Sequence, residues 1–445
     1  MKRFFQTIAN MFKIEDLRKR LIYTFLLIVV YRLGSYIVIP GIDATQIASL
    51  QQRSTEGLVG LLNMFSGGAF GNASIFALGV MPYISASIVI QLLGVFLPSF
   101  QRLQREGESG RRKMNQYTRY LTIVILAIQG PAYVASLRST LPAEAFVTTM
   151  NGWWYGVFAT LILIGGTMFV MWLGERITDR GIGNGISLII MIGIIARLPM
   201  ALWLEISEKW TTSMGGMLVL IIELVVLFLV FVGTIALVQA VRKIPVQYAK
   251  RVVGNRQYGG VRQYIPLKVN AAGVMPIIFA QAIMFLPITI AGFRQSGEMS
   301  GFLSAFTNIN GFWYNFVFFI LIILFTYFYT AVTINSNQMA EDIKKNGGFI
   351  PGVKPGKKTA EYLDTIMSRI TLPGSIFLAI VAIMPALVSL MGVTTSFAHF
   401  YGGTSLLILV GVVLDTLQQI ESYLLMRHYD GLTKSGRIKG RVGRM

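Results

Sequence analysis

The chain has no cysteine and only two histidines among its 445 residues. The lack of cysteine excludes a disulfide framework, thiolate chemistry and any metal site built on cysteine. The two histidines, His399 and His428, are too few and too far apart in the sequence to suggest a metal site. We therefore predict that the protein binds no metal and no cofactor.

Charged residues are also scarce. They make up 13% of the chain, whereas 54% of the residues are hydrophobic. A soluble chain of this length would suggest about three domains, but this composition indicates that lipid surrounds most of the protein. The net charge of +19 must then lie in loops and tails, where it can orient a membrane protein or bind nucleic acid.

Catalytic motifs are missing as well. The sequence contains no HExxH, no P-loop and no GxSxG motif with candidate partners. The spacing in Gly181–Gly185 invites comparison with a dinucleotide-binding loop, but this stretch follows a charged turn and not a β-strand. It predicts close helix packing or a tight re-entry. We expect that the protein is not an enzyme.

Ten stretches are long and apolar enough to cross a bilayer as helices. Residues 1–20 precede them; they are basic and carry apolar residues at helical spacing, which predicts a helix along the membrane surface. No cleavable signal peptide is recognised, because the first apolar run is too long. The predicted spans are 21–39, 74–97, 118–137, 153–173, 182–201, 216–240, 270–292, 312–334, 371–391 and 403–425.

Lysine and arginine predict the orientation of these spans. Of the 39 basic residues, 33 lie in one alternate set of segments, five lie in the other, and Arg32 lies inside the first span. Because basic loops stay in the cytoplasm, this asymmetry predicts a multi-pass protein with both termini cytoplasmic. The basic tail, 426–445, would then be cytoplasmic too.

A short internal match divides the chain into two halves. Gly79–Ile84 (GVMPYI) in the second span is similar to Gly273–Ile278 (GVMPII) in the seventh. This predicts five spans in 21–201, an extracytoplasmic join at 202–215 and five spans in 216–425. Halves of odd span number have opposite orientations, as in many transport proteins. We also expect the proline of each match to kink its helix.

The stretch Asn63–Leu93 joins a small, polar, glycine-rich segment directly to the second span. The polar part is too short to span a membrane, and irregular backbone survives at membrane depth only where protein or a water-filled cavity surrounds it. We interpret it as a re-entrant plug inside a channel. An outer loop of low complexity is the alternative.

Charges inside the spans are few, namely Arg32, Glu223 and Asp415, and each is a functional candidate. Their scarcity argues against a proton relay or an ion-coupled carrier. Two long loops, 241–269 and 335–369, together with the basic tail, predict a docking platform for an anionic partner such as ribosomal RNA or an acidic protein surface. The basic loop 102–119 fits either binding or simple orientation.

Five stretches together resemble the SecY family, which forms the protein-conducting channel of bacteria. The resemblance covers nearly the whole chain. It implies an all-α polytopic membrane protein with ten transmembrane helices in two inverted five-helix halves and a plug at about 58–72, opening sideways between spans 2 and 7. The stretches are LGVMPYISASIVIQLL (Leu78–Leu93), EGESGRRKMNQYTRY (Glu106–Tyr120), RGIGNGISL (Arg180–Leu188), PLKVNAAGVMP (Pro266–Pro276) and GGTSLL (Gly402–Leu407).

The resemblance also implies roles for individual residues. An apolar ring at mid-membrane would consist of Val80, Ile84, Ile186, Ile190, Ile278 and Ile408, with Val80 in place of an expected isoleucine. The plug would include Asn63, Phe65, Ser66, Gly67, Gly68, Phe70, Gly71 and Asn72. The lateral gate would include Pro82, Ser85, Ser87, Gln91, Asn270, Pro276 and Gln281. Partner docking would fall to Arg251, Arg256, Lys354, Lys357 and Lys358, with Lys354 in place of the usual arginine.

The resemblance implies a channel that moves unfolded secretory polypeptides across the bacterial plasma membrane and releases membrane segments sideways into lipid. The resemblance implies SecE and SecG as further subunits, the SecA ATPase or a ribosome as the source of energy, and signal sequences and anionic lipid as ligands. A secondary transporter for a small solute is the opposing hypothesis, but it needs a polar site at mid-membrane. A membrane-embedded hydrolase would need a nucleophile and a base, which the sequence does not suggest.

Overall fold

The computed structural model describes residues 14–47, 60, 63–147, 152–211, 216–248, 251–253, 256–258, 262–281, 283–284 and 311–434. The chain divides into two compact units. The first consists of Met1–Ser54, Val59–Arg197 and Gly411–Met445, and the second of Thr55–Leu58 and Leu198–Val410. Each unit is described by itself. Most of the predicted surface helix at 1–20 and the end of the basic tail lie outside the described residues.

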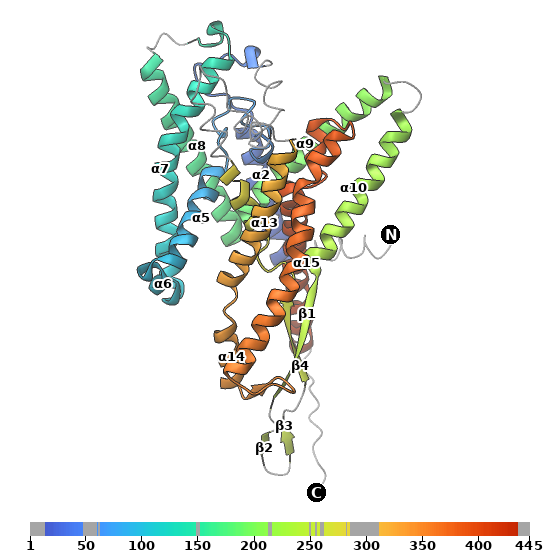
Figure 1. Cartoon of the computed structure of the whole chain (residues 1–445). Helices are drawn as coiled ribbons and strands as arrows, with labels where there is room; N and C mark the ends of the chain where they lie inside the picture. The colour runs from blue at the N-terminus through green and yellow to red at the C-terminus, as the bar shows by residue number, and fades with distance from the viewer. Residues whose placement is uncertain are drawn as a thin grey trace. The chain divides into compact units, whose positions relative to one another are not determined.

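Long helices form most of the first unit (Figure 1). The prediction that the Gly181–Gly185 stretch packs helices closely is confirmed, because a Cβ on Gly185 would lie 2.0 Å from the backbone oxygen of Gly174. Two further helices, α9 (Gly185–Thr211) and α17 (Gly403–Lys434), begin in one unit and end in the other. The other elements are α2 (Glu15–Gly34), η1 (Ala44–Ile47), α5 (Met81–Phe96), α6 (Pro98–Arg105), α7 (Glu108–Thr140), η2 (Ala143–Ala145) and α8 (Gly152–Arg180).

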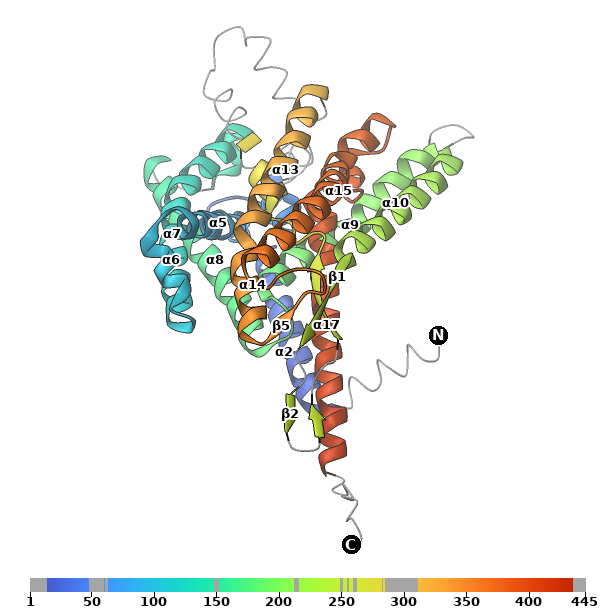
Figure 2. The same cartoon turned by 60° about the horizontal axis from the view of Figure 1, so that its bottom comes forward.

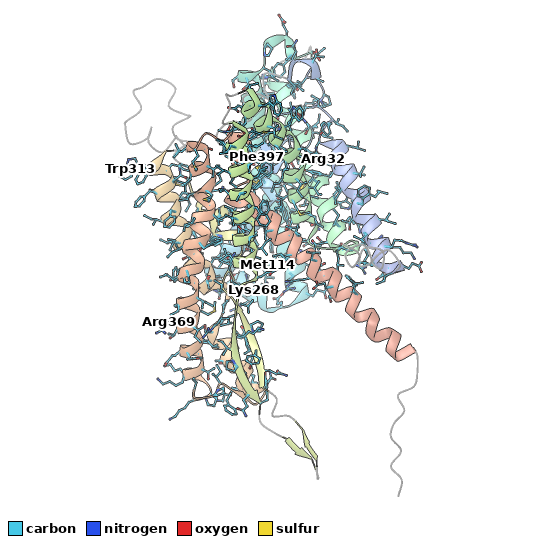
Figure 3. All side chains as sticks on the ribbon, turned by 90° about the vertical axis from the view of Figure 1, so that its right-hand side faces the viewer. Arg32, Met114, Lys268, Trp313, Arg369 and Phe397 are labelled. Atoms are coloured by element: carbon cyan, nitrogen blue, oxygen red, sulfur yellow. The ribbon has the colours of Figure 1, made fainter. Side chains whose placement is uncertain are left out.

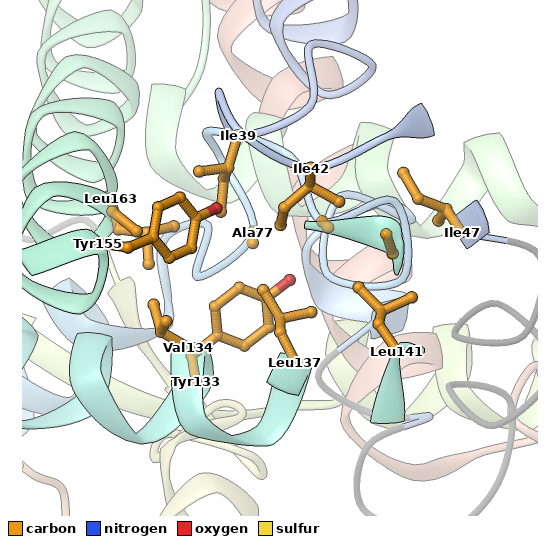
Figure 4. Close-up of a cluster of buried hydrophobic side chains, with 13 residues drawn as sticks. Ile39, Ile42, Ile47, Ala77, Tyr133, Val134, Leu137, Leu141, Tyr155 and Leu163 are labelled. Atoms are coloured by element: carbon orange, nitrogen blue, oxygen red, sulfur yellow. The ribbon is translucent and has the colours of Figure 1, made fainter. Parts of the chain in front are cut away.

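The core of the first unit forms where α7 and α8 face two irregular segments (Figure 4). Tyr155, Ala159 and Leu163 are spaced four residues apart on α8, so they lie on one face of that helix. The irregular segments are joined by a hydrogen bond of 2.9 Å from the Ile39 N–H to the Ala73 carbonyl. The segment that precedes α5 is therefore fixed inside protein.

The second unit packs α13 (Phe312–Thr333) along α15 (Lys357–Leu390). Phe318 and Ile322 of α13 are buried with Leu378 and Ala382 of α15. Ile277 joins this core from a helical segment at 275–281. The unit also contains α10 (Gly216–Gln239), α14 (Ser336–Lys345) and α16 (Thr395–Ala398).

A sheet occupies much of what the sequence predicts as the basic loop 241–269. Strand β1 (Val241–Tyr248) pairs antiparallel with β4 (Arg262–Lys268) from Val241↔Lys268 to Gln247↔Arg262, and β5 (Gly348–Phe349) pairs on the other side of β1 (Figure 2). Ile244 and Val246 point to the same side of β1 and are buried against α14 and α15. The short strands β2 (Arg251–Val253) and β3 (Arg256–Tyr258) form a second ladder.

Within the described residues, seven helices are long and apolar enough to cross a membrane, or eight if α5 and α6 count as one bent span. In each of the seven, less than half of the most apolar window is buried, as expected for helices facing lipid. Trp153, Trp210 and Trp313 lie exposed near helix ends, where tryptophan favours the membrane interface (Figure 3 labels Trp313).

Two predicted boundaries are wrong in an informative way. The second span does not begin as a helix at Ser74, because Ser74 forms an isolated β-bridge with Val38, residues 75–80 form turns and the helix begins at Met81. Gly79 has a φ of +53°, a left-handed conformation that cannot be part of a right-handed helix, so the helix can begin only after this residue. The first span ends as a helix at Gly34, not at residue 39, and continues as irregular chain.

Candidate functional site

The candidate plug, residues 63–72, is a compact turn whose own side chains accept hydrogen bonds from two of its backbone N–H groups. The Asn63 side-chain oxygen accepts a hydrogen bond of 2.8 Å from the Gly71 N–H, and the Ser66 hydroxyl oxygen accepts one of 3.0 Å from the Phe70 N–H. Gly67 and Gly68 have φ values of +65° and +95°, which other residues adopt only with strain. The small, polar and glycine-rich residues predict a turn, and the hydrogen bonds to the Asn63 and Ser66 side chains account for its shape. Positions 58, 59, 61 and 62 of the predicted plug lie outside the described residues.

Side chains from two helices hold this turn by its carbonyl groups. Tyr31 of α2 donates a hydrogen bond of 3.2 Å to the Ser66 carbonyl, and Arg32 donates one of 2.8 Å to the Gly67 carbonyl. Tyr133 of α7 donates one of 2.8 Å to the Phe70 carbonyl. Figure 3 labels Arg32 on its helix. Three carbonyls of one short turn therefore depend on donors from elsewhere in the unit.

Helix α9 approaches the same turn through a glycine. A Cβ on Gly67 would lie 2.8 Å from the Gly193 Cα, so backbone meets backbone at that point. The guanidinium of Arg197 lies beside Gly68, and this places a second arginine next to the turn. Asn63, Phe65 and Ser66 are all buried. The irregular backbone is thus surrounded by protein, which is the condition for its survival at membrane depth.

We expect Tyr133→Phe to release the plug more often. The change leaves the Phe70 carbonyl without its donor, which costs about 1–3 kcal/mol and corresponds to roughly 5- to 150-fold more of the released state. The readout is the labelling rate of a cysteine placed at the fully buried Ala69 by a membrane-impermeant thiol reagent. The natural chain has no cysteine, so the background is clean.

Tyr155→Phe is the matched control for this prediction. Tyr155 belongs to the same core, but its buried hydroxyl has no hydrogen-bond partner among the described residues. Its removal should leave the labelling rate of Ala69→Cys unchanged. Equal labelling in the two tyrosine variants would mean that the Tyr133 bond does not hold the plug.

The residues predicted for the apolar ring divide between the two units. Val80 is the N-cap of α5 and is buried, and Ile84 lies in the first turn of that helix, half-buried. Ile186 and Ile190 lie in the first turns of α9, where Ile186 packs against Gly174 of α8. Ile278 and Ile408 belong to the second unit. Their convergence on one ring stays a prediction.

The repeated GVMP motif has the same local structure in both units. Gly79 and Gly273 have φ values of +53° and +63°, and a helix begins two residues after each. The Ile84 N–H donates to the Val80 carbonyl at 3.0 Å, and the Ile278 N–H donates to the Val274 carbonyl at 3.4 Å. The six-residue match is therefore a shared way of starting a helix.

This helix start corrects the prediction of a proline kink. Pro82 and Pro276 are each the second residue of a helix, where the backbone N–H has no partner in the helix to lose. Each proline stabilises the beginning of a helix and does not bend its middle. Both residues are buried.

The other residues predicted for the lateral gate lie on these helices or just before them. On α5 the Ser85 hydroxyl donates to the Met81 carbonyl at 3.1 Å, and the Gln91 side-chain nitrogen lies 3.4 Å from the Ser87 hydroxyl. In the second unit Asn270 precedes the helical segment 275–281 that contains Gln281, and the Asn270 side-chain oxygen is buried with no partner among the described residues. A gate between them stays a prediction.

The residues predicted to dock partners lie at two tips of the second unit. Lys354, Lys357 and Lys358 are exposed around a turn in which Gly352 and Gly356 have φ values of +85° and +101°. The turn is fixed from inside by the buried Ile350 and by a hydrogen bond of 3.0 Å from the Thr359 hydroxyl to the Lys354 carbonyl. Arg251 and Arg256 lie on β2 and β3, and their side chains are outside the described ones.

Sequence reasoning singles out three charges inside the spans, and the structure places two of them in polar contacts. Arg32 binds the plug, Glu223 lies 3.1 Å from Lys209, and Asp415 is exposed on α17. It misses Tyr31 and Tyr133, because a buried tyrosine in an apolar helix has no distinctive pattern. The polar, glycine-rich turn was the only available signal that donors were needed there.

The comparisons with known proteins agree with one another. A family model described as SecY matches residues 74–417. The protein translocase subunits SecY of Streptomyces galbus and Thermotoga maritima are 43% and 41% identical to this chain, and the alignments cover 96% and 98% of it and 99% of each relative. More than 40% identity over the whole length is too much for a resemblance of fold alone.

Solved structures show the same fold at low identity. A structure of a protein-conducting channel has a TM-score of 0.57 at 16% identity and covers 91% of this chain and 92% of its own. Sec61 in a canine ribosome–channel complex has a TM-score of 0.53 at 15% identity, with the same coverage. The prediction of an all-α polytopic membrane protein is confirmed, and its fold is that of protein-conducting channels. The chain belongs to the SecY family.

Proposed function

We propose that this chain is the pore-forming subunit of a channel that moves unfolded polypeptides across a membrane, with residues 63–72 as its plug. The observation that carries the proposal is the buried turn held by Tyr31, Arg32 and Tyr133, a short irregular segment enclosed by spanning helices. Membership of the SecY family supports the same function.

The apolar ring suits a pore for polypeptides of any sequence. Aliphatic side chains do not hydrogen-bond to a moving chain, and an apolar constriction opposes wetting when it is empty. Val80 and Ile84 at the start of α5 would provide one side of the ring, and Ile278 and Ile408 another. A transporter of a small solute needs a specific polar site, which these positions do not provide.

We further propose that the protein lies in the bacterial plasma membrane with both termini cytoplasmic. The distribution of 33 basic residues on one side supports this orientation. The sheet β1–β4 and the turn around Lys354 would then be cytoplasmic, where a ribosome or the SecA ATPase would supply the energy. SecE and SecG would complete the channel, and signal sequences would enter between the second and seventh spans to reach lipid.

Crosslinking from the ring tests the function directly. Single cysteines at Ile84, Ile278 and Ile408 are introduced into the cysteine-free chain, and each is crosslinked to a cysteine in a stalled secretory polypeptide. We expect crosslinks from all three positions and none from a control cysteine at Ile128, which is 70% exposed on α7. Crosslinks only from loop positions, with the three isoleucines silent, would favour the solute transporter.

A further inference from the structure

A buried cluster of charged residues lies in the second unit, away from the plug. It joins the end of α9 to the first turns of α10 and to the segment between α15 and α16. The Lys209 ammonium lies 3.1 Å from Glu223 Oε1 and 3.7 Å from Glu205 Oε1, and it donates a hydrogen bond of 2.9 Å to the Gly392 carbonyl. The Thr394 N–H donates to Glu205 Oε2 at 2.9 Å, and the Thr394 hydroxyl donates to the same oxygen.

The charges of this cluster do not balance. Glu205 is fully buried, Glu223 is 7% exposed, and the Lys209 ammonium lies 3.7 Å from a carboxyl oxygen of Glu205 and 3.1 Å from one of Glu223. One ammonium therefore faces two carboxylates, which leaves a net negative charge in a buried place. An unbalanced buried charge costs several kcal/mol, so the cluster needs one more positive charge.

Unpartnered atoms indicate where that charge belongs. Glu223 Oε2 is buried with neither a hydrogen-bond nor an ion-pair partner among the described residues, and Glu205 Oε1 has only the Lys209 ammonium at 3.7 Å. Tyr401 has no exposed surface, and its hydroxyl likewise has no hydrogen-bond partner among the described residues. It lies within electrostatic range of both carboxyl groups. Such atoms in the middle of a network show that a donor is missing.

We propose that the cluster of Glu205, Glu223, Lys209 and Thr394 is a proton-binding site that holds one proton between its two carboxyl groups. A metal ion suits the place poorly, because the Lys209 ammonium already occupies the space between the carboxylates and would repel it. A proton supplies both the missing charge and the missing donor without needing room.

The contacts assign the proton to Glu223. Glu205 Oε2 accepts two hydrogen bonds from Thr394, whereas no hydroxyl or backbone N–H among the described residues donates to Glu223. A protonated Glu223 can donate to Glu205 Oε1 while its other oxygen stays beside Lys209. Solvent can exchange the proton, because Thr394 lines an open groove together with Ser207, Glu208 and Thr211. Glu208 and Tyr401 are the other ionisable groups facing the cluster.

The proton would fasten the segment from Gly392 to Tyr401 onto α9 and α10. When it leaves at higher pH, two negative carboxylates face a single ammonium, and their repulsion opposes the contacts that Glu205 makes with Thr394. The wild-type protein should therefore lose thermal stability as pH rises through the titration of the site. Glu223→Gln keeps a donor at the position and removes the titration, so its melting temperature should lack this fall.

Infrared spectroscopy of the full chain in lipid nanodiscs tests the proposal directly. A protonated carboxylic acid has a carbonyl stretching band that a carboxylate lacks. We expect this band in the wild type at a pH at which exposed carboxyl groups have already ionised, its loss as pH rises further, and its absence in Glu223→Gln. Glu341→Gln, which removes an exposed carboxyl group on α14, should keep both the band and the fall of melting temperature with pH.

A second variant covers the case in which Glu223→Gln does not fold. Glu205→Gln leaves a single carboxyl group beside Lys209, so the charges balance without a proton and the band should vanish in this variant too. A wild type without the band, or a band that survives unchanged in both variants, would overturn the proposal. So would a melting temperature that Na⁺ or Ca²⁺ raises in the wild type but not in Glu223→Gln, because the site would then bind a metal ion. The test does not depend on polypeptide transport.

Discussion

Replacing Ile84 and Ile278 together with serine should make the resting channel leak ions. Each isoleucine contributes about 1.5–3 kcal/mol to the preference of the constriction for a dry state, on the scale of burying such a side chain. Loss of about 3 kcal/mol or more in total corresponds to a resting conductance raised by roughly 100-fold. The measurement is single-channel current across a planar bilayer, without substrate or partner.

Two positions five residues further along supply the controls for this experiment. Val89 on α5 and Ile283 beyond the segment 275–281 are 41% and 40% exposed, on other faces of the same helices. Their replacement by serine should leave the resting current at the wild-type value. If the double variant of Ile84 and Ile278 conducts no more than this control, the two isoleucines do not form the seal.

Lys354→Glu should weaken the binding of the cytoplasmic partner and reduce translocation while the fold stays intact. Lys354 is exposed on a turn fixed by the buried Ile350, so the change reverses a surface charge without removing packing. A hydrogen bond to a charged group contributes about 1.5–3 kcal/mol, which predicts roughly 10- to 100-fold weaker binding. Binding of purified ribosomes and of SecA to the channel in nanodiscs measures this.

Two further variants separate the role of Lys354 from general charge effects. Lys344→Glu makes the same change of net charge on α14, at another exposed position of the unit. It should lower binding less than Lys354→Glu does. Lys354→Arg restores the planar guanidinium that grips carboxylates and phosphates with two hydrogen bonds, and it should bind at least as tightly as the wild type. Undiminished binding by Lys354→Glu would remove this residue from the docking surface.

Hydropathy predicted most of the helices, because spanning segments must be long and apolar whatever their neighbours are. It could not predict where α5 begins, since the boundary depends on the φ of Gly79 and not on apolarity. The strands in the basic loop left a weak signal in the alternation of Ile244 and Val246, which the excess of lysine and arginine obscured. Charge and strand pairing are independent properties of a segment.

The candidate site was predicted as a segment but not as a set of contacts. The small residues of 63–72 indicated a turn, whereas the bond between Tyr133 and Phe70 joins residues 63 positions apart. The bond between Glu205 and Thr394 spans 189 positions. A single sequence carries no record of such pairings, so in-span charges such as Arg32 and Glu223 could be recognised as important while their partners could not.

The ladder between β1 and β4 has a consequence for chain length. Its innermost pair, Val241↔Lys268, follows directly on the end of α10 at Gln239 and lies seven residues before the helical segment 275–281. Neighbouring strands are about 4.8 Å apart, so the ladder fixes the distance between the chain that leaves α10 and the chain that leads to the segment 275–281. Residues inserted at the outer end of the hairpin would therefore add only a small loop-closure entropy, about 0.6 kcal/mol per doubling of its length. The hairpin that contains β1 and β4 can lengthen or shorten in evolution without altering the spacing of the helices that carry it.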